Sequence, residues 1–275
     1  MTLFFTGVVI FDGWFDGSLT TSAADNKSIQ GTILCVLIAI LVIPAQLEFS
    51  KLAETRGINI FTPLVTTVSI LFATSWYWFQ FIAFEREVCF VLLATFALFG
   101  LLLTQYIYYG TTGVLANCGA SCFSIMYVGI LSAFVPAIRI EYGIWALLMF
   151  VFVVKFADIG AYITGSLFGK HQFSPKISPK KSWEGMAGAI VFAILIALLF
   201  GRVFDIMSWM SATVFGICFA FIGQLGDLAE SLIKRDTGQK DSSNSVPGFG
   251  GMLDVIDSPL AAAPFAYLFF RLSGM

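Results

Sequence analysis

Apolar runs separated by short polar stretches dominate the chain. Runs of about the length that crosses a bilayer as a helix occupy residues 31–48, 60–83, 88–108, 114–137, 142–165, 186–204, 208–226 and 258–273. Residues 3–11 are also apolar, but they fall short of the ~20 residues that a spanning helix needs. We therefore expect a first helix that is clipped at its N-terminus or only half inserted. The pattern predicts an all-α fold with about nine transmembrane helices.

The composition supports this interpretation. Of the 275 residues 58% are hydrophobic and only 12% are charged, whereas a soluble domain averages about 25% charged residues. The chain is therefore predicted to be a polytopic integral membrane protein, with residues 1–275 forming a single transmembrane domain. Small residues such as Gly216 and Ala220 would let these helices pack closely. A net charge of −2 gives no case for nucleic-acid binding. The single histidine, His171, argues against histidine-based triads and zinc motifs.

The basic residues predict the orientation in the membrane. Nine of the fifteen lysines and arginines lie in three alternate loops, namely Lys51, Arg56, Lys170, Lys176, Lys180, Lys181, Lys234, Arg235 and Lys240. Loops next to spanning helices that are rich in lysine and arginine face the cytoplasm. We therefore expect loops 49–59, 166–185 and 227–257 on the cytoplasmic side, so that both long charged loops share one face.

The stretch 226–258 gathers carboxylates between two apolar runs. It holds six of the seventeen acidic residues, namely Asp227, Glu230, Asp236, Asp241, Asp254 and Asp257. Asp227 with Glu230, and Asp254 with Asp257, have the i,i+3 spacing that places two oxygen ligands on one helix face, which suits Mg²⁺. The basic residues Lys234, Arg235 and Lys240, with the backbone N–H groups of Gly248, Gly250 and Gly251, are candidates to hold phosphates. This combination predicts phosphoryl or nucleotidyl transfer.

Several of these acids also have simpler interpretations. Asp236 and Asp241 flank basic residues and would be solvated, and Glu230 can pair with Lys234 at i,i+4. Asp257 precedes Ser258 and Pro259, a pattern typical of a helix start. Asp227 and Asp254 have no comparably simple interpretation. They stand at opposite ends of the loop, where two helix ends could bring them together around an ion.

A second group of polar residues occupies 155–185. Asp158 lies inside an apolar run, where an ionised carboxylate is costly and usually functional. Lys155, three residues earlier, is an equally good candidate for a structural ion pair, and the two interpretations are compatible. The proline-containing run from Ser174 to Lys181 presents lysines near the lipid headgroups. Simple positive-inside anchoring would explain these lysines as well.

At these two stretches the sequence resembles the phosphatidate cytidylyltransferases, also called CDP-diacylglycerol synthases. The downstream part of the family signature falls on Ser231, Lys234, Arg235, Lys240, Asp241, Pro247, Gly250, Gly251, Asp254 and Asp257. The upstream part falls on Asp158, Ala161, Tyr162, Ser178, Pro179, Lys180, Lys181, Ser182, Glu184 and Gly185. Together the matches cover about a quarter of the chain. In two places the chain departs from the signature, because Phe249 replaces a histidine and Val255 replaces an arginine.

The resemblance implies that CTP and phosphatidate give CDP-diacylglycerol and pyrophosphate in a Mg²⁺-dependent reaction. For this reaction we expect Asp227 and Asp254, helped by Asp257, to hold the metal, while Lys234, Arg235 and Lys240 neutralise the triphosphate and the pyrophosphate leaving group. Ten further residues are expected to bind substrate or line a polar cavity that faces the cytoplasm and opens sideways to lipid: Asp158, Ser178, Lys180, Lys181, Glu184, Glu230, Ser231, Asp241, Gly250 and Gly251.

Three other interpretations stay open on the sequence. A CTP-dependent polyprenol or phytol kinase would share the nucleotide and the metal, and the lost His and Arg would also fit a diverged inactive paralogue. An ion-coupled transporter would use Lys155, Asp158 and Asp227 inside the membrane. The expected location is a bacterial inner membrane, with the active site on the cytoplasmic side. A second, monovalent cation and a homodimer are both left open.

Overall fold

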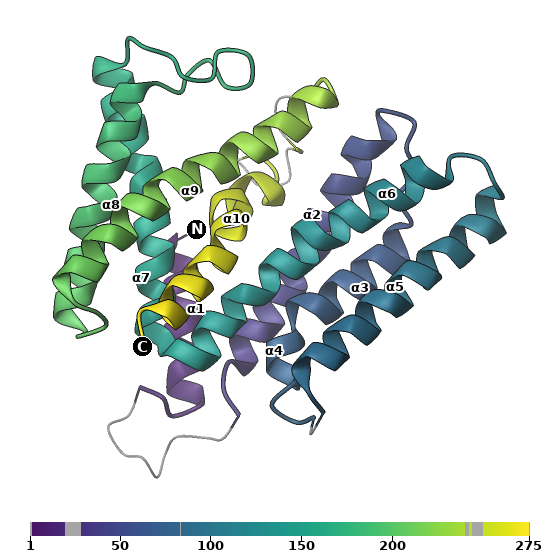
Figure 1. Ribbon diagram of the computed structural model, residues 1–275, viewed down its shortest axis with the longest axis horizontal. Coiled ribbons are helices and arrows are strands. Elements are labelled where there is room, and N and C mark those ends of the chain that lie inside the picture. Colours follow the sequence, from purple (N-terminus) through teal and green to yellow (C-terminus); the bar gives the residue numbers. More distant parts are fainter. Residues whose placement is uncertain (1, 20–28, 83, 240–241, 244–249, 275) are drawn as a thin grey trace.

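The computed structural model describes residues 2–19, 29–82, 84–239, 242–243 and 250–274. These residues form helices and no strand (Figure 1). In chain order the helices are α1 (Thr2–Phe15), α2 (Thr32–Glu54), α3 (Thr62–Ala73), α4 (Ser75–Trp78), α5 (Arg86–Tyr109), α6 (Val114–Ser124), the π-helix η1 (Ile125–Ile130), α7 (Leu131–Phe168), α8 (Trp183–Val203), α9 (Trp209–Asp236) and α10 (Met252–Leu272). The all-α prediction is thus confirmed.

Six helical segments among the described residues are long and apolar enough to cross a membrane, against the nine that the sequence predicts. Two predicted spans, 3–11 and 60–83, form shorter helices, since α1 has 14 residues and α3 has 12. Two others, 114–137 and 142–165, belong to one helical run of 55 residues. That run is broken by the backbone of Gly143, whose φ of 88° takes it out of the helical region. The chain is a membrane protein, and the count of nine remains a prediction.

The helices α7, α8, α9 and α10 pack against one another and carry both polar stretches, while α2, α3, α5 and α6 lie together beside them (Figure 1). Two glycines bring α8 close to its neighbours. A Cβ on Gly188 would lie 2.7 Å from the carbonyl oxygen of Gly160 in α7. A Cβ on Gly216 in α9 would lie 2.7 Å from the backbone of Ile194 in α8. The expectation that Gly216 allows close packing is therefore met.

A buried ion-pair cluster fixes α1 to the rest of the bundle. The guanidinium of Arg139 in α7 is fully buried, and it donates to Asp12 over 3.1 Å and to Asp16 over 2.7 Å. Asp12 also accepts the backbone N–H groups of Ile33 and Leu34 at the start of α2. Buried charges are tolerated only when they are paired and hydrogen-bonded. The cluster therefore joins α1, α2 and α7 at one point.

We predict that Arg139→Met destabilises the protein by ~3–5 kcal/mol, because two buried carboxylates would lose their cation. Thermal unfolding of the purified protein in detergent would measure the change. Arg202→Met, the same chemical change at an exposed position at the end of α8, is the matched control and should leave the midpoint within a few degrees. Equal midpoints for the two variants would contradict a structural role for the cluster.

Candidate active site

A polar cavity of about 330 Å³ lies where α7, α9 and α10 meet the loop that leads into α8. Both polar stretches of the sequence contribute to it. The residues that line it are Lys155, Asp158, Ala161, Tyr162, Phe173, Ser178, Lys180, Lys181, Ser182, Gly185, Met186, Gln224, Asp227, Asp254, Asp257 and Ser258. Residues from 155–186 and from 224–258 thus share one cavity, because α7 packs against both α9 and α10.

Three carboxylates meet at this site. Asp227 and Glu230 lie one turn apart on α9, and Asp257 faces them from α10, so that one oxygen of each lies within 4.8 Å of the others. The side chains of Glu230 and Asp257 are buried. Among the described residues, Glu230 Oε1 has no hydrogen-bond partner. A buried carboxylate oxygen without a partner is costly unless a cation completes it, and oxygen-only ligands suit Mg²⁺. These three residues therefore fit a hard divalent cation.

Asp254, which the sequence analysis expects to hold the metal, lines the same cavity but is not one of these three carboxylates. Its Oδ1 lies 2.9 Å from the ammonium of Lys234, and its Oδ2 accepts the backbone N–H groups of Gly251 over 2.8 Å and Ser242 over 3.2 Å. Lys234 also forms the expected i,i+4 pair with Glu230, over 2.7 Å. The N–H of Gly251 is thus used by the protein itself and is not free for a phosphate. The carboxylate of Asp254 orients the start of α10.

The loop before α8 brings lysines to the carboxylates. Lys181 pairs with Asp227 over 2.6 Å and donates to the carbonyl oxygen of Gln224 over 3.0 Å. Glu184, in the first turn of α8, accepts the backbone N–H groups of Lys170 and His171 and lies 2.7 Å from the ring of His171. Glu184 does not line the cavity. It holds the loop that presents Ser178, Lys180 and Lys181, a different task from the substrate contact expected of it.

The other predicted residues divide into two groups. Asp158 lines the cavity, accepts a hydrogen bond from Gln224 over 3.3 Å and lies 3.9 Å from Lys155, so the structural pair expected for it is present but long. Among the described residues, Ser231, Arg235 and Gly250 do not line the cavity. Arg235 is exposed and donates to the carbonyl oxygen of Ile177 over 3.3 Å. Lys240 and Asp241 lie outside the described residues, as do Gly248 and Phe249.

Comparison with known proteins places this chain in a family. A sequence model of the cytidylyltransferase family matches residues 27–273. The chain belongs to this family. It is 42% identical to the phosphatidate cytidylyltransferase of Haemophilus influenzae over 131 residues, which are 45% of this chain and 46% of that protein. It is 35% identical to the phosphatidate cytidylyltransferase of Bacillus subtilis over 175 residues, 62% of this chain and 65% of that protein. An uncharacterized Escherichia coli protein, YnbB, is 31% identical over 218 residues, 75% of this chain and 73% of its own. The match with the Haemophilus influenzae protein thus spans about half the length of that relative.

One residue of this cytidylyltransferase-family site was missed by the sequence analysis. Glu48, in α2, accepts the backbone N–H groups of Met252 and Leu253, each over 2.9 Å, and the hydroxyl of Ser242 over 3.1 Å. It thereby occupies the N-terminus of α10, where a negative charge is favourable. A Cβ on Gly251 would lie 2.5 Å from Glu48 Oε2, so a larger residue there would displace the Glu48 carboxylate from this position. The sequence feature that could have identified Glu48 is an acidic residue at the end of the apolar run 31–48.

We predict that Glu48→Gln destabilises the protein by ~1–3 kcal/mol, because an NH₂ group would face backbone donors that need an acceptor. Thermal unfolding in detergent would measure it. Glu54→Gln makes the same change on an exposed carboxylate of the same helix and should be close to neutral. If both variants melt together, the contact of Glu48 with α10 contributes little.

Proposed function

We propose that this protein is a phosphatidate cytidylyltransferase, which converts CTP and phosphatidate to CDP-diacylglycerol and pyrophosphate. The observation that carries the proposal is the group of Asp227, Glu230 and Asp257, of which Asp227 and Asp257 line a cavity that also holds lysines, between helices apolar enough to cross a membrane. Such a cavity suits a nucleoside triphosphate, a divalent cation and a lipid acceptor together. Family membership and the printed names of the relatives support the same reaction.

The metal in this proposal is Mg²⁺, held by Asp227, Glu230 and Asp257. Glu230 takes the place that the sequence gave to Asp254, because Glu230 Oε1 is buried without a hydrogen-bond partner, whereas both oxygens of Asp254 contact donors of the protein. When bound, Mg²⁺ supplies charge neutralisation at the phosphate oxygens of CTP. Lys234 balances the charge of Glu230 and joins it to Asp254. That ion pair keeps α9 and α10 at the spacing which the three ligands need.

The chain's own residues then bind and orient the substrates. Lys180 and Lys181 line the cavity and are placed to hold the CTP phosphates, and Lys181 would exchange its contact with Asp227 for one with a phosphate. A phosphate oxygen of phosphatidate attacks the α-phosphorus of CTP, the bond from that phosphorus to the β-phosphate oxygen breaks, and pyrophosphate leaves. The attacking oxygen is already largely ionised at neutral pH, so no strong general base is needed. The replacement of the signature's histidine by Phe249 is compatible with this chemistry.

The proposed setting is a bacterial inner membrane, with the chain multi-pass and the cavity facing the cytoplasm. The lysines and arginines of loops 49–59, 166–185 and 227–257 support that orientation. CTP would enter from the cytoplasm and phosphatidate sideways from the bilayer. A second, monovalent cation and a homodimer remain expectations of the sequence and carry no part of the mechanism.

We predict that Glu230→Gln raises the Mg²⁺ concentration for half-maximal rate at least tenfold, because one of three carboxylate ligands would lose its charge. Asp254→Asn should instead lower stability with a smaller effect on the Mg²⁺ requirement, since its oxygens contact Lys234 and backbone N–H groups. Titration of the rate against Mg²⁺ would compare the two. Asp236→Asn, at an exposed position on α9, is the control. The reverse ranking would restore Asp254 as the ligand.

The reaction itself is tested with purified protein, phosphatidate, Mg²⁺ and CTP labelled at either the α- or the γ-phosphate. We expect α-label in the lipid product and γ-label in pyrophosphate, in equal amounts. Label from the γ-phosphate in a lipid alcohol would instead identify a CTP-dependent kinase. Absence of turnover with both labels, in protein that still binds CTP in a Mg²⁺-dependent manner, would indicate an inactive paralogue.

A further inference from the structure

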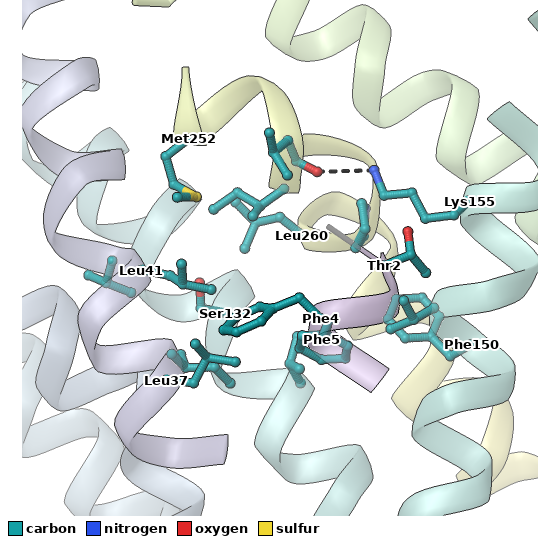
Figure 2. A pocket seen from close by; sticks show the side chains of 17 residues that line it. Thr2, Phe4, Phe5, Leu37, Leu41, Ser132, Phe150, Lys155, Met252 and Leu260 are labelled. Atoms are coloured by element: carbon teal, nitrogen blue, oxygen red, sulfur yellow. Dashed lines mark hydrogen bonds between the residues drawn. The ribbon is translucent and has the colours of Figure 1, made fainter. Parts of the chain in front are cut away.

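A second cavity, of about 150 Å³, adjoins the polar one and is almost entirely apolar. Its walls come from α1, α2, α7 and α10, and Figure 2 shows Phe4, Phe5, Leu37, Leu41 and Leu260 around it. Lys155 is at its edge. Of the described residues, Lys155 is the one that lines both this cavity and the polar cavity with the carboxylates. An ammonium group therefore lies at the boundary between a polar and an apolar compartment.

The contacts of Lys155 leave much of its binding capacity available. Its Nζ donates to the backbone carbonyl oxygen of Val255 over 3.0 Å, the dashed line in Figure 2. Its carboxylate partner, Asp158, is 3.9 Å away, the longest ion pair among the described residues, where the others measure 2.6–3.2 Å. An ammonium has three donors, and the side chain of Lys155 is 25% exposed. Lys155 can therefore bind an anion without losing a close ion pair.

The hydrogen bond from Lys155 to the carbonyl oxygen of Val255 has a structural explanation, which is distinct from a role in substrate binding. In a regular helix the carbonyl of Val255 would accept the N–H of residue 259, but that residue is Pro259, which has none. Lys155 therefore satisfies an orphaned carbonyl of α10. A neutral donor would do this as well. The positive charge is not needed for that task, and it is costly inside a membrane segment.

The position of Val255 offers a reason for the positive charge of Lys155. Val255 stands where the signature discussed above has an arginine, and it lines the apolar cavity. The ammonium of Lys155 reaches the backbone of that same residue from α7. A cation thus occupies the neighbourhood of position 255, although the side chain there is apolar.

We propose, on the basis of the proposed function, that Lys155 binds the phosphate of the acceptor lipid and that the apolar cavity takes the beginning of one acyl chain. A phosphate monoester on a diacylglycerol is an amphiphile whose anion and chains must separate at one point, and Lys155 marks that point between the two cavities. From there the lipid phosphate faces Asp227 and Asp257, which line the polar cavity and form one group with Glu230. Lys155 is a substrate-binding residue of this chain outside the residues that match the signature.

The test compares Lys155→Gln, which keeps a donor for the Val255 carbonyl but removes the charge, with Lys155→Arg, which keeps both. With phosphatidate varied in mixed micelles, Lys155→Gln should raise the KM for phosphatidate about tenfold or more. It should change the KM for CTP by less than about twofold, and Lys155→Arg should restore most of the lipid affinity. Lys51→Gln, at an exposed lysine of α2, is the matched control. Equal increases in both KM values, or an unchanged lipid KM with a lower melting temperature, would assign Lys155 a structural role only.

A binding measurement without CTP separates this inference from the proposed function. Purified wild-type protein should retain radiolabelled dioleoyl phosphatidate in preference to dioleoylglycerol, and Lys155→Gln should lose that preference. If the wild type keeps the preference but forms no CDP-diacylglycerol, the proposed function fails and the lipid site stands. If the wild type turns over while Lys155→Gln retains the preference, the lipid site fails alone. A wild type without the preference overturns the inference.

The acyl-chain part has its own variant. Leu37→Trp would fill the apolar cavity, which Leu37 lines from α2. It should raise the KM for dioleoyl phosphatidate severalfold and leave the KM for a short-chain phosphatidate near the wild-type value. Equal effects on the two lipids would show that the chain binds elsewhere.

Discussion

The ammonium of Lys234 contacts carboxylates from two helices, Glu230 on its own helix and Asp254 on α10, and the site depends on this arrangement. Charge inside an apolar bundle must be compensated where it lies, since no water is available to solvate it. The ion pair therefore fixes the distance between α9 and the start of α10. Once that distance is set, Asp257, one turn further along α10, faces Asp227 and Glu230.

Glu48 completes the same constraint from a third helix. It occupies the backbone donors at the start of α10, which would otherwise be unpaired inside the bundle. Acids thus perform two tasks here. Glu48 and Asp254 hold protein donors, whereas Asp227, Glu230 and Asp257 gather their oxygens around a point that suits a cation. The proposed chemistry needs both groups, because ligands on two helices are useful only when the helices cannot separate.

The distribution of polar and apolar compartments relates the site to a lipid substrate. The polar cavity holds the carboxylates and lysines, the apolar cavity adjoins it, and Lys155 lies between them. The structure describes only one of the two positions at which the chain departs from the family signature. Phe249 lies outside the described residues, whereas Val255 lines the apolar cavity beside a lysine from α7. The cation beside position 255 thus comes from α7.

The sequence by itself determined the all-α membrane character, the two polar stretches, the family and the pairing of Glu230 with Lys234, because hydropathy and i,i+4 spacing are local properties. Only the tertiary structure decided which acids meet. It gave Asp254 to Lys234 and to backbone N–H groups, turned Glu184 toward its own loop, and brought Glu48 from α2 to α10. It also broke the run 60–83 into two short helices and placed a break in the helical run 114–168 at Gly143. These outcomes depend on contacts between helices distant in the chain, and no spacing within one segment encodes them.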